Sequence, residues 1–291
     1  MPTKTGHKES HTKQTGGGIS TRTQQIASFT ERGVRELFGN KAVLFWSIAF
    51  PVGFYLLTIS LFIDTSQTPD GALPYVKAGT AVTYGTFGAI IASLNAFGQQ
   101  LAMDFEEDRY ELLRSLPVSA SADLVGRMVA GIALSVLALL SVLGVAVLTD
   151  ATFTLKSAIS LPVVAVAILS FTVFWMVVAV AVTTLIQDSR YASIITVSMA
   201  LALYFLTGFN GGNPSMFQGS EQLLNWLPNT LPTRLIVEHI AATPAQYTSP
   251  DRLAPPSADF GVAIMSVYAI VAFGVGLLIM RRGVYKRSVL P

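Results

Sequence analysis

Hydrophobic residues are gathered into six stretches, each about as long as a helix that crosses a bilayer. These stretches cover residues 42–63, 76–102, 124–149, 158–185, 191–209 and 260–280. A hydrocarbon core about 30 Å thick requires about 20 helical residues at 1.5 Å per residue. Inside lipid the backbone must satisfy its own hydrogen bonds, so stretches of this length are typical of helices. We therefore predict an all-α membrane protein with six transmembrane helices, in which residues 21–291 form one domain.

Two segments precede the first apolar stretch. Residues 1–20 are rich in Gly, Ser, Thr and Lys and lack a hydrophobic face, so we expect a disordered cytoplasmic tail. Residues 21–40 have the spacing of an amphipathic helix. Its apolar side consists of Ile26, Phe29, Val34, Leu37 and Phe38. This helix has too few apolar residues to span, so we expect an elbow helix in the cytoplasmic interface, with its basic residues toward lipid headgroups. An ordinary packing helix is the alternative.

The distribution of charge predicts the orientation of the chain. Only 12% of the residues are charged, against roughly a quarter in a soluble domain. With a cytoplasmic N-terminus, 15 of the 19 Lys and Arg residues fall in inner segments. The other four are Lys77, Lys156, Arg234 and Arg252. This positive-inside bias predicts that both termini are cytoplasmic and that 64–75, 150–157 and 210–259 are external.

Small and polar residues recur on one face of the second stretch, at steps of three and four residues. Such a face usually marks a contact between membrane helices. It can also line the path of a substrate. The candidates for a translocation path or a dimer interface are Thr80, Tyr84, Gly88, Asn95 and Gln99.

The most charged segment of the chain, residues 104–127, follows the second stretch. Charged residues alternate there with Phe105, Tyr110, Leu112, Leu113 and Leu116, up to Pro117. Acidic residues near its start and Arg114 near its end match a helix macrodipole. We predict a short surface helix over 104–116, because a solvated loop, the alternative, has no reason to expose this apolar set.

Residues 210–259 form the longest connection between two apolar stretches. The sequence Asn-Gly-Gly-Asn-Pro at 210–214 interrupts any helix. Two short amphipathic pieces follow, around 216–227 and 230–242, and the second places Arg234 and Glu238 one helical turn apart. Both pieces are too short to span. We predict an external re-entrant or interfacial helix pair before the last span.

The sequence lacks the common motifs of catalysis and nucleotide binding. It contains no G-x-x-x-x-G-K-[ST] loop, so we expect no ATPase site in this chain. Cysteine is absent and no apolar stretch holds paired histidines at ligand spacing, so we expect no metal and no other cofactor. The near absence of ionisable residues inside the apolar stretches argues against an ion-coupled carrier. A membrane-embedded enzyme is disfavoured too, because it requires a polar constellation inside the spans.

Two short motifs resemble the permease subunits of type-2 ABC exporters. Residues 110–119, YELLRSLPVS, are similar to the family pattern L-E-x-L-x-x-x-P-[LV]-S, with Tyr110 at the usual Leu. Asp108-Arg109 replaces the Gly-Thr that commonly precedes this pattern. Leu231-Pro232, followed by Arg234 and Glu238, resembles the stretch before the last span. The order of elements, from elbow helix to re-entrant pair, is similar over nearly the whole chain.

This resemblance implies that residues 104–117 form a coupling helix, which docks into a groove on a separate ATPase subunit. Phe105, Tyr110 and Leu113 are then expected to fill the groove, while neighbouring charges pair at its rim. The full set of residues with an implied ATPase-coupling role is Phe105, Glu106, Glu107, Arg109, Tyr110, Glu111, Leu113, Arg114 and Pro117.

The function implied is that of an exporter subunit in the plasma membrane, which moves a hydrophobic or amphipathic substrate out of the cell. Its implied partners are two ABC ATPase subunits, which carry ATP and Mg, and a second permease copy in a homodimer or a paralogous heterodimer. The chain also contacts the lipid bilayer, and we expect no nucleic-acid partner. The alternative is a passive channel or a membrane-integral scaffold, neither of which requires the charged segment.

Overall fold

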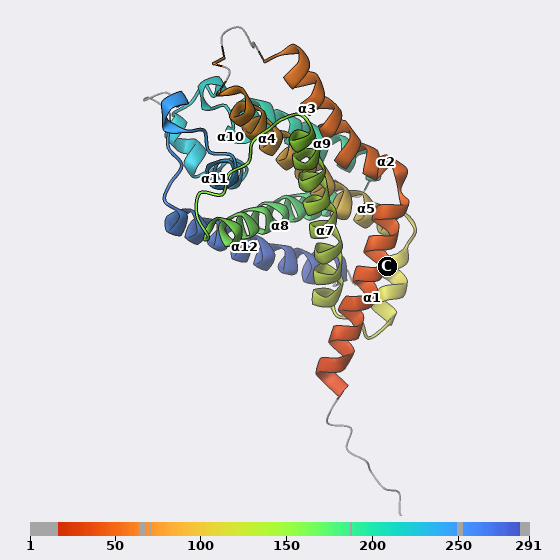
Figure 1. The fold of residues 1–291 in the computed structure, drawn as a ribbon. Coiled ribbons are helices and arrows are strands. Elements are labelled where there is room, and N and C mark those ends of the chain that lie inside the picture. Colours follow the sequence, from red (N-terminus) through yellow and green to blue (C-terminus); the bar gives the residue numbers. More distant parts are fainter. Residues whose placement is uncertain (1–16, 64–67, 70, 187, 249–252, 286–291) are drawn as a thin grey trace, which may run out of the picture.

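The computed structural model describes residues 17–63, 68–69, 71–186, 188–248 and 253–285 (Figure 1). These residues are mainly helical, and none of them belongs to a β-strand. The all-α fold class is therefore confirmed. Most of the predicted tail lies outside the described residues. Its last four residues were expected to be disordered, but they belong to α1 (Gly17–Gly39). Once a helix has formed, each further residue that joins it gains a backbone hydrogen bond, so the helix extends easily.

Within the described residues, five helical segments are long and apolar enough to cross a bilayer. They are Lys41–Leu61, Leu73–Glu106, Ala120–Leu148, Ser160–Ile186 and Ala258–Tyr285. They coincide with five of the six predicted stretches. The remaining stretch, 191–209, forms the shorter apolar helix α9 (Ser189–Leu206), so the sixth span stays a prediction.

Three of these segments contain a turn of π-helix. The first joins α2 (Lys41–Leu44), η1 (Phe45–Ala49) and α3 (Phe50–Leu61). The second joins α4 (Leu73–Leu94), η2 (Asn95–Gln99) and α5 (Gln100–Glu106). The last joins α12 (Ala258–Ile279) and η6 (Met280–Tyr285). The third and fourth segments are the uninterrupted helices α7 (Ala120–Leu148) and α8 (Ser160–Ile186).

The long helix Leu73–Glu106 is the centre of the fold. It is enclosed by α3, α7, α8 and α9, and 94% of the residues in its apolar 18-residue stretch are buried. Gly88 permits a close approach to η1, because a Cβ at this position would lie 2.7 Å from the carbonyl oxygen of Ser47. The neighbouring pair α8 and α12 runs side by side along one flank of the molecule (Figure 1).

Helix α1 packs lengthwise on the first half of α7 (Figure 1). A glycine makes this contact close: a Cβ at Gly126 would lie 2.4 Å from the Cβ of Phe29. Leu37 of α1 is 1% exposed and belongs to the main apolar core. The predicted apolar side of the elbow helix therefore faces protein. Its position in a membrane interface stays a prediction.

The loops gather at two opposite ends of the long helix, as the predicted topology requires. At the first end, Thr152 N donates to Pro74 O (3.1 Å) and Thr154 N donates to Ile240 O (3.0 Å). Three segments that the charge distribution assigns to the outside therefore meet. At the second end, α1, η6 and the segment that follows α5 meet around the start of α7. This arrangement agrees with the predicted alternation of spans, while the cytoplasmic assignment stays a prediction.

Helix α11 (Leu231–Ile240) is the second predicted piece of the external connection. It packs among α4, α8 and α12, and its Leu235 and Ile236 are fully buried. Its Thr233 Oγ1 donates to Thr86 Oγ1 of α4 (3.2 Å). The first predicted piece consists only of the short 3-10 turns η3 (Pro214–Met216) and η4 (Glu221–Asn225). Re-entry of this pair into a bilayer stays a prediction.

Arg234 and Glu238 lie one helical turn apart, and each has partners elsewhere. Glu238 forms an ion pair with Lys156 (2.5 Å). The Arg234 guanidinium donates to Asn225 Oδ1 (2.8 Å), Gly211 O (3.3 Å) and Leu253 O (2.7 Å). Arg234 is buried, so the N–H groups of its guanidinium require hydrogen-bond acceptors inside the protein, and these oxygens supply them.

Candidate functional site

A buried set of ionic and hydroxyl groups lies at the second end of the helical bundle. We call Asp104, Tyr110, Asp123, Arg127 and Tyr285 the ionic network. Its first acid, Asp104, lies near the end of α5 and is 1% exposed. The Arg127 guanidinium donates to Asp104 through Nη2 and to Asp123 Oδ1 through Nε (2.7 Å). One arginine of α7 therefore bridges two buried carboxylates.

Two tyrosines complete the ionic network. Tyr110 Oη donates to Asp123 Oδ2 (3.0 Å), and Tyr285 Oη donates to the same oxygen (3.1 Å). Burial raises the pKa of the Tyr110 hydroxyl well above its usual value, and the nearby carboxylate of Asp123 adds to this effect. Tyr110 therefore keeps its proton and acts as a hydrogen-bond donor. The ionic network ties the last turn of the last span to α7 and to the segment after α5.

Three further side chains close the network toward the surface. Arg32 Nη2 donates to Asp104 Oδ1 (2.6 Å), and Arg109 Nη1 reaches the same oxygen (3.1 Å). Glu36 pairs with Arg32 (2.8 Å) and with Arg109 (3.5 Å). Arg32 of the elbow helix was expected to face lipid headgroups, but it contacts Asp104, because a buried carboxylate requires cationic partners.

The predicted coupling helix begins later than the sequence suggested. Residues 104–106 are the last turn of the long helix, and Asp108 then adopts a left-handed conformation (φ 52°). Only Arg109–Ser115 form a separate helix, α6. Asp tolerates a left-handed conformation better than most residues, which explains why the chain turns here. The prediction of one helix over 104–116 was therefore wrong at its start.

Helix α6 has an inner side in the protein and an outer side at the surface. Tyr110 is 2% exposed, and its ring lies against those of Phe105 (centroids 5.3 Å apart) and Tyr285 (5.7 Å). Leu113 is partly buried against the main core. On the outer side, Leu112 is 66% exposed, and Leu116, the first residue after the helix, is 48% exposed.

Tyr110, Phe105 and Leu113 were expected to fill a partner's groove. Tyr110 is buried in this chain and leaves almost no surface for a partner. Phe105 and Leu113 are partly buried, so their contact with a partner stays a prediction. Glu111 and Leu112 form the outer face of α6, and the exposed Leu116 follows directly after the helix. Pro117 is exposed, and its carbonyl oxygen accepts from Gln25 Nε2 of α1 (2.9 Å). Gln25 Oε1 also accepts from Ser119 N (3.2 Å), so α1 is hydrogen-bonded to both ends of the short link 117–119 between α6 and α7.

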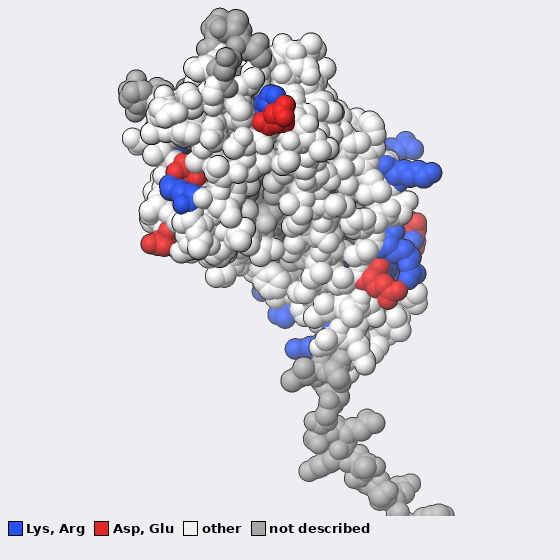
Figure 2. Space-filling model, viewed as in Figure 1, with Lys and Arg blue, Asp and Glu red and all other residues white. Residues whose placement is uncertain are grey.

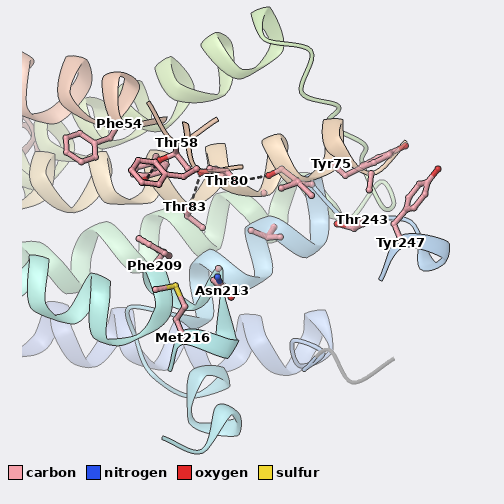
Figure 3. Close-up of a pocket in the computed structure, with 18 of the residues that line it drawn as sticks. Phe54, Thr58, Tyr75, Thr80, Thr83, Phe209, Asn213, Met216, Thr243 and Tyr247 are labelled. Atoms are coloured by element: carbon pink, nitrogen blue, oxygen red, sulfur yellow. Dashed lines mark hydrogen bonds between the residues drawn. The ribbon is translucent and has the colours of Figure 1, made fainter. Parts of the chain in front are cut away.

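A cavity of about 800 Å³ lies toward the first end of the bundle (Figure 3). Its walls come from α3, α4, the end of α9, and the external connection. Aromatic rings of Phe54, Phe205 and Phe209 form one part of the wall, and threonine hydroxyls form another. Among the described residues that line it, none is Asp, Glu, Lys, Arg or His.

The predicted stripe of the second span divides between two environments. Thr80 and Tyr84 line the cavity, and Tyr84 Oη is hydrogen-bonded to Thr58 Oγ1 (2.7 Å). Gly88 makes the helix contact with η1 and does not line the cavity. Asn95 and Gln99 lie in η2, also away from it. The stripe therefore marks a cavity wall at one end and a helix contact in the middle.

The comparisons with known proteins identify the family. A family model described as "ABC-2 type transporter" matches residues 24–243, which is most of the chain. This chain belongs to the ABC-2 type transporter family. It is a permease subunit, the membrane component of such a transporter. No curated protein matched it.

The match extends from α1 to the end of α11, so it includes the ionic network except Tyr285, and most of the cavity wall of this ABC-2 permease. Sequence reasoning missed four network residues, Asp104, Asp123, Arg127 and Tyr285. One signal was present, because Asp123 and Arg127 are four residues apart at the start of an apolar helix. Charged side chains are few on the face of the permease in Figure 2. A charge within a span is costly, so its presence there indicates a structural or functional role.

Proposed function

We propose that this chain is the membrane subunit of an ATP-driven exporter, in which two permease copies and two ATPase subunits move a hydrophobic or amphipathic substrate out of the cell. The observation that carries the proposal is the two-sided structure of α6. Its inner side is anchored through Tyr110 to the ionic network, while its outer side presents Leu112 to the surface, with the exposed Leu116 directly after the helix. A short helix held in this way is suited to receive and transmit force from a docked partner.

The long helix Leu73–Glu106 provides the route from α6 to the cavity. Asp104, at one end, is bonded to Arg127 and Arg109. Thr80 and Tyr84, nearer the other end, line the cavity. The 34 residues of this helix extend about 50 Å at 1.5 Å per residue. A displacement of α6 by an ATPase would therefore move one wall of the cavity through a continuous, buried helix.

The cavity supports the substrate class. Its wall is apolar and aromatic with a few hydroxyl groups, and no described lining residue carries a charge. Its volume, about 800 Å³, lies within the range of about 300–1,000 Å³ that is usual for sites of small molecules. An apolar or amphipathic molecule gains free energy by burying its surface there.

The proposal is tested by purifying the tagged permease from its native membranes after mild cross-linking, and by identifying its partners by mass spectrometry. We expect an ABC ATPase subunit in a one-to-one ratio and ATP hydrolysis by the complex. We expect no hydrolysis by the isolated permease, because it has no phosphate-binding loop. Hydrolysis by the isolated, contaminant-free chain, or a complex without an ABC ATPase, would contradict the proposal.

A further inference from the structure

Three threonine hydroxyls of the cavity wall use their hydrogens within the protein, while Tyr75, Tyr247 and the amide of Asn213 bring groups that can both donate and accept. Thr80 Oγ1 donates to Val76 O (2.8 Å), and Thr83 Oγ1 donates to Thr80 O (2.7 Å). Thr248 Oγ1 lies at hydrogen-bonding distance from the carbonyl oxygens of Thr243 (3.1 Å) and Pro244 (3.0 Å). The hydroxyl hydrogens of these lining threonines are therefore used within the protein. Each oxygen keeps lone pairs, so the three threonines offer acceptors to a ligand.

The charge of the lining residues also restricts which ligands fit the cavity. Among the described lining residues there is no Lys or Arg to pair with a phosphate, sulfate or carboxylate, and no Asp or Glu to pair with an ammonium group. An ion that leaves water without a partner pays a large desolvation cost. The described part of the cavity wall therefore disfavours ligands with either sign of charge.

The two ends of the cavity differ in composition. In Figure 3, Phe54 and Phe209 lie toward one end, together with Thr58 and Asn213, while Tyr75, Thr243 and Tyr247 lie toward the other. The second of these ends borders the external connection, which contains Thr243 and Tyr247. A ligand with one apolar and one polar part has a single orientation that matches both ends.

We propose that the cavity binds an uncharged amphiphile whose polar part carries hydroxyl or N–H donors, with its apolar part against the phenylalanines and its polar part toward Tyr75 and Tyr247. This inference rests on the proposed function, because it names the substrate class of the same cavity. An alkyl glucoside is the simplest probe of this chemistry: it has a hydrocarbon chain, several hydroxyl donors and no charge.

Two glycines provide a matched pair of variants that separate the cavity from the rest of the membrane surface. Gly79 lines the cavity, and a Cβ added there meets nothing within 4 Å. Gly79→Leu therefore fills the cavity without displacing backbone. Gly144 of α7 also has open space around its Cβ position but does not line the cavity. Both substitutions replace glycine in a helix by a better helix former, so neither is expected to impair folding.

Two threonines provide a second pair, which tests the hydrogen-bond acceptors. Thr80→Val removes an acceptor from the cavity wall with little change of shape. Thr184 of α8 makes the same kind of bond, from its Oγ1 to Val180 O (2.5 Å), and does not line the cavity. Thr184→Val is therefore the control for the loss of a helix-internal hydroxyl.

The experiment is photolabelling of the full-length chain in lipid nanodiscs with a decyl glucoside that carries a diazirine in its chain. Matched probes have a trimethylammonium or a sulfate group in place of glucose. We expect saturable labelling by the glucoside alone, at least tenfold weaker in Gly79→Leu and unchanged in Gly144→Leu. Thr80→Val should weaken it about fivefold, as expected for one hydrogen bond, and Thr184→Val should not.

Labelling by either charged probe at the level of the glucoside would overturn the proposal, as would undiminished labelling of Gly79→Leu or no saturable labelling at all. The same preparations are assayed for binding of the ATPase subunit, which does not involve Gly79 or Thr80. Loss of glucoside binding with intact ATPase binding rejects the substrate class alone. Absence of ATPase binding with intact glucoside binding rejects the exporter function alone.

Discussion

Asp104 and Arg127 form an ion pair in which both side chains are almost completely buried, with exposures of 1% and 3%. They come from two different span helices, and Arg127 also binds the buried Asp123. Two carboxylates and one guanidinium in this position are tolerated because Arg32 and Arg109 supply further positive charge to Asp104. The pair joins the long central helix to α7 at the place where α6 begins.

Replacement of Arg127 by Met is expected to destabilise the protein strongly. The change leaves Asp104 and Asp123 buried without their main partner, and breaking a buried pair in this way costs about 3–5 kcal/mol. The matched control is Arg35→Met, because Arg35 and its partner Glu31 are 77% and 73% exposed. We expect less than about 0.5 kcal/mol for the control. The measurement is the free energy of unfolding in detergent; equal values for both variants would show that the ionic network contributes no stability.

The contact between α1 and α7 gives a second stability prediction. Gly126→Ala places a methyl group against Phe29 and the backbone of α1, where no space exists, and overpacking of this kind costs about 1–3 kcal/mol. Gly144→Ala on the same helix meets nothing within 4 Å and should stabilise by up to about 1 kcal/mol. Thermal unfolding of the two variants is the measurement. A stabilised Gly126→Ala would mean that α1 is not held against α7.

Most of the fold could be predicted from the apolar stretches, because a backbone segment of this length in a membrane must be helical. Five of them are confirmed as helices of spanning length, while the stretch 191–209 forms the shorter helix α9, so the sixth span stays a prediction. The break at Asp108 was not predictable, because a single left-handed residue leaves no periodic signal. The pairing of Asp104 with Arg127 was equally hidden, since 23 residues separate them and only the folded bundle brings them together.

The candidate site was predicted in part. Thr80 and Tyr84 belong to a visible polar stripe, and both line the cavity. The sequence did not show which apolar residues of the charged segment face outward. Tyr110 sits where the family pattern has Leu, and its hydroxyl finds Asp123 in the core. Leu112 then points outward, because residues two apart in a helix lie on different sides.

The pH dependence of stability should reveal the buried hydroxyl of Tyr110. Burial raises its pKa above the usual value of about 10, so the folded protein keeps this proton when the unfolded chain has lost it. This contribution is fully present below pH 10 and decreases as the pH rises above it. In Tyr110→Phe the loss of stability between about pH 10 and 11 should be smaller than in the wild type. Tyr191→Phe, at an exposed position, should behave as the wild type does.

The predicted topology is open to direct labelling, because the chain contains no cysteine. We expect a membrane-impermeant thiol reagent to label Ser220→Cys from outside intact cells and Ser115→Cys only after the membrane is opened. Both positions are exposed. Labelling of Ser220→Cys only from the inside would reverse the orientation and contradict the assignment of 210–259 to the external side.

The most direct test of the central claim, that the outer face of α6 docks the ATPase subunit, is co-purification of this subunit with Leu112→Ala. Burial of a leucine side chain is worth about 1.5–3 kcal/mol, so its loss should weaken docking about tenfold or more. The matched control is Leu148→Ala, because Leu148 is 83% exposed at the opposite end of α7. Both variants should insert and unfold as the wild type does, since both side chains are largely exposed. We predict that Leu112→Ala loses the ATPase subunit and that Leu148→Ala retains it; equal retention by the two variants would contradict the account.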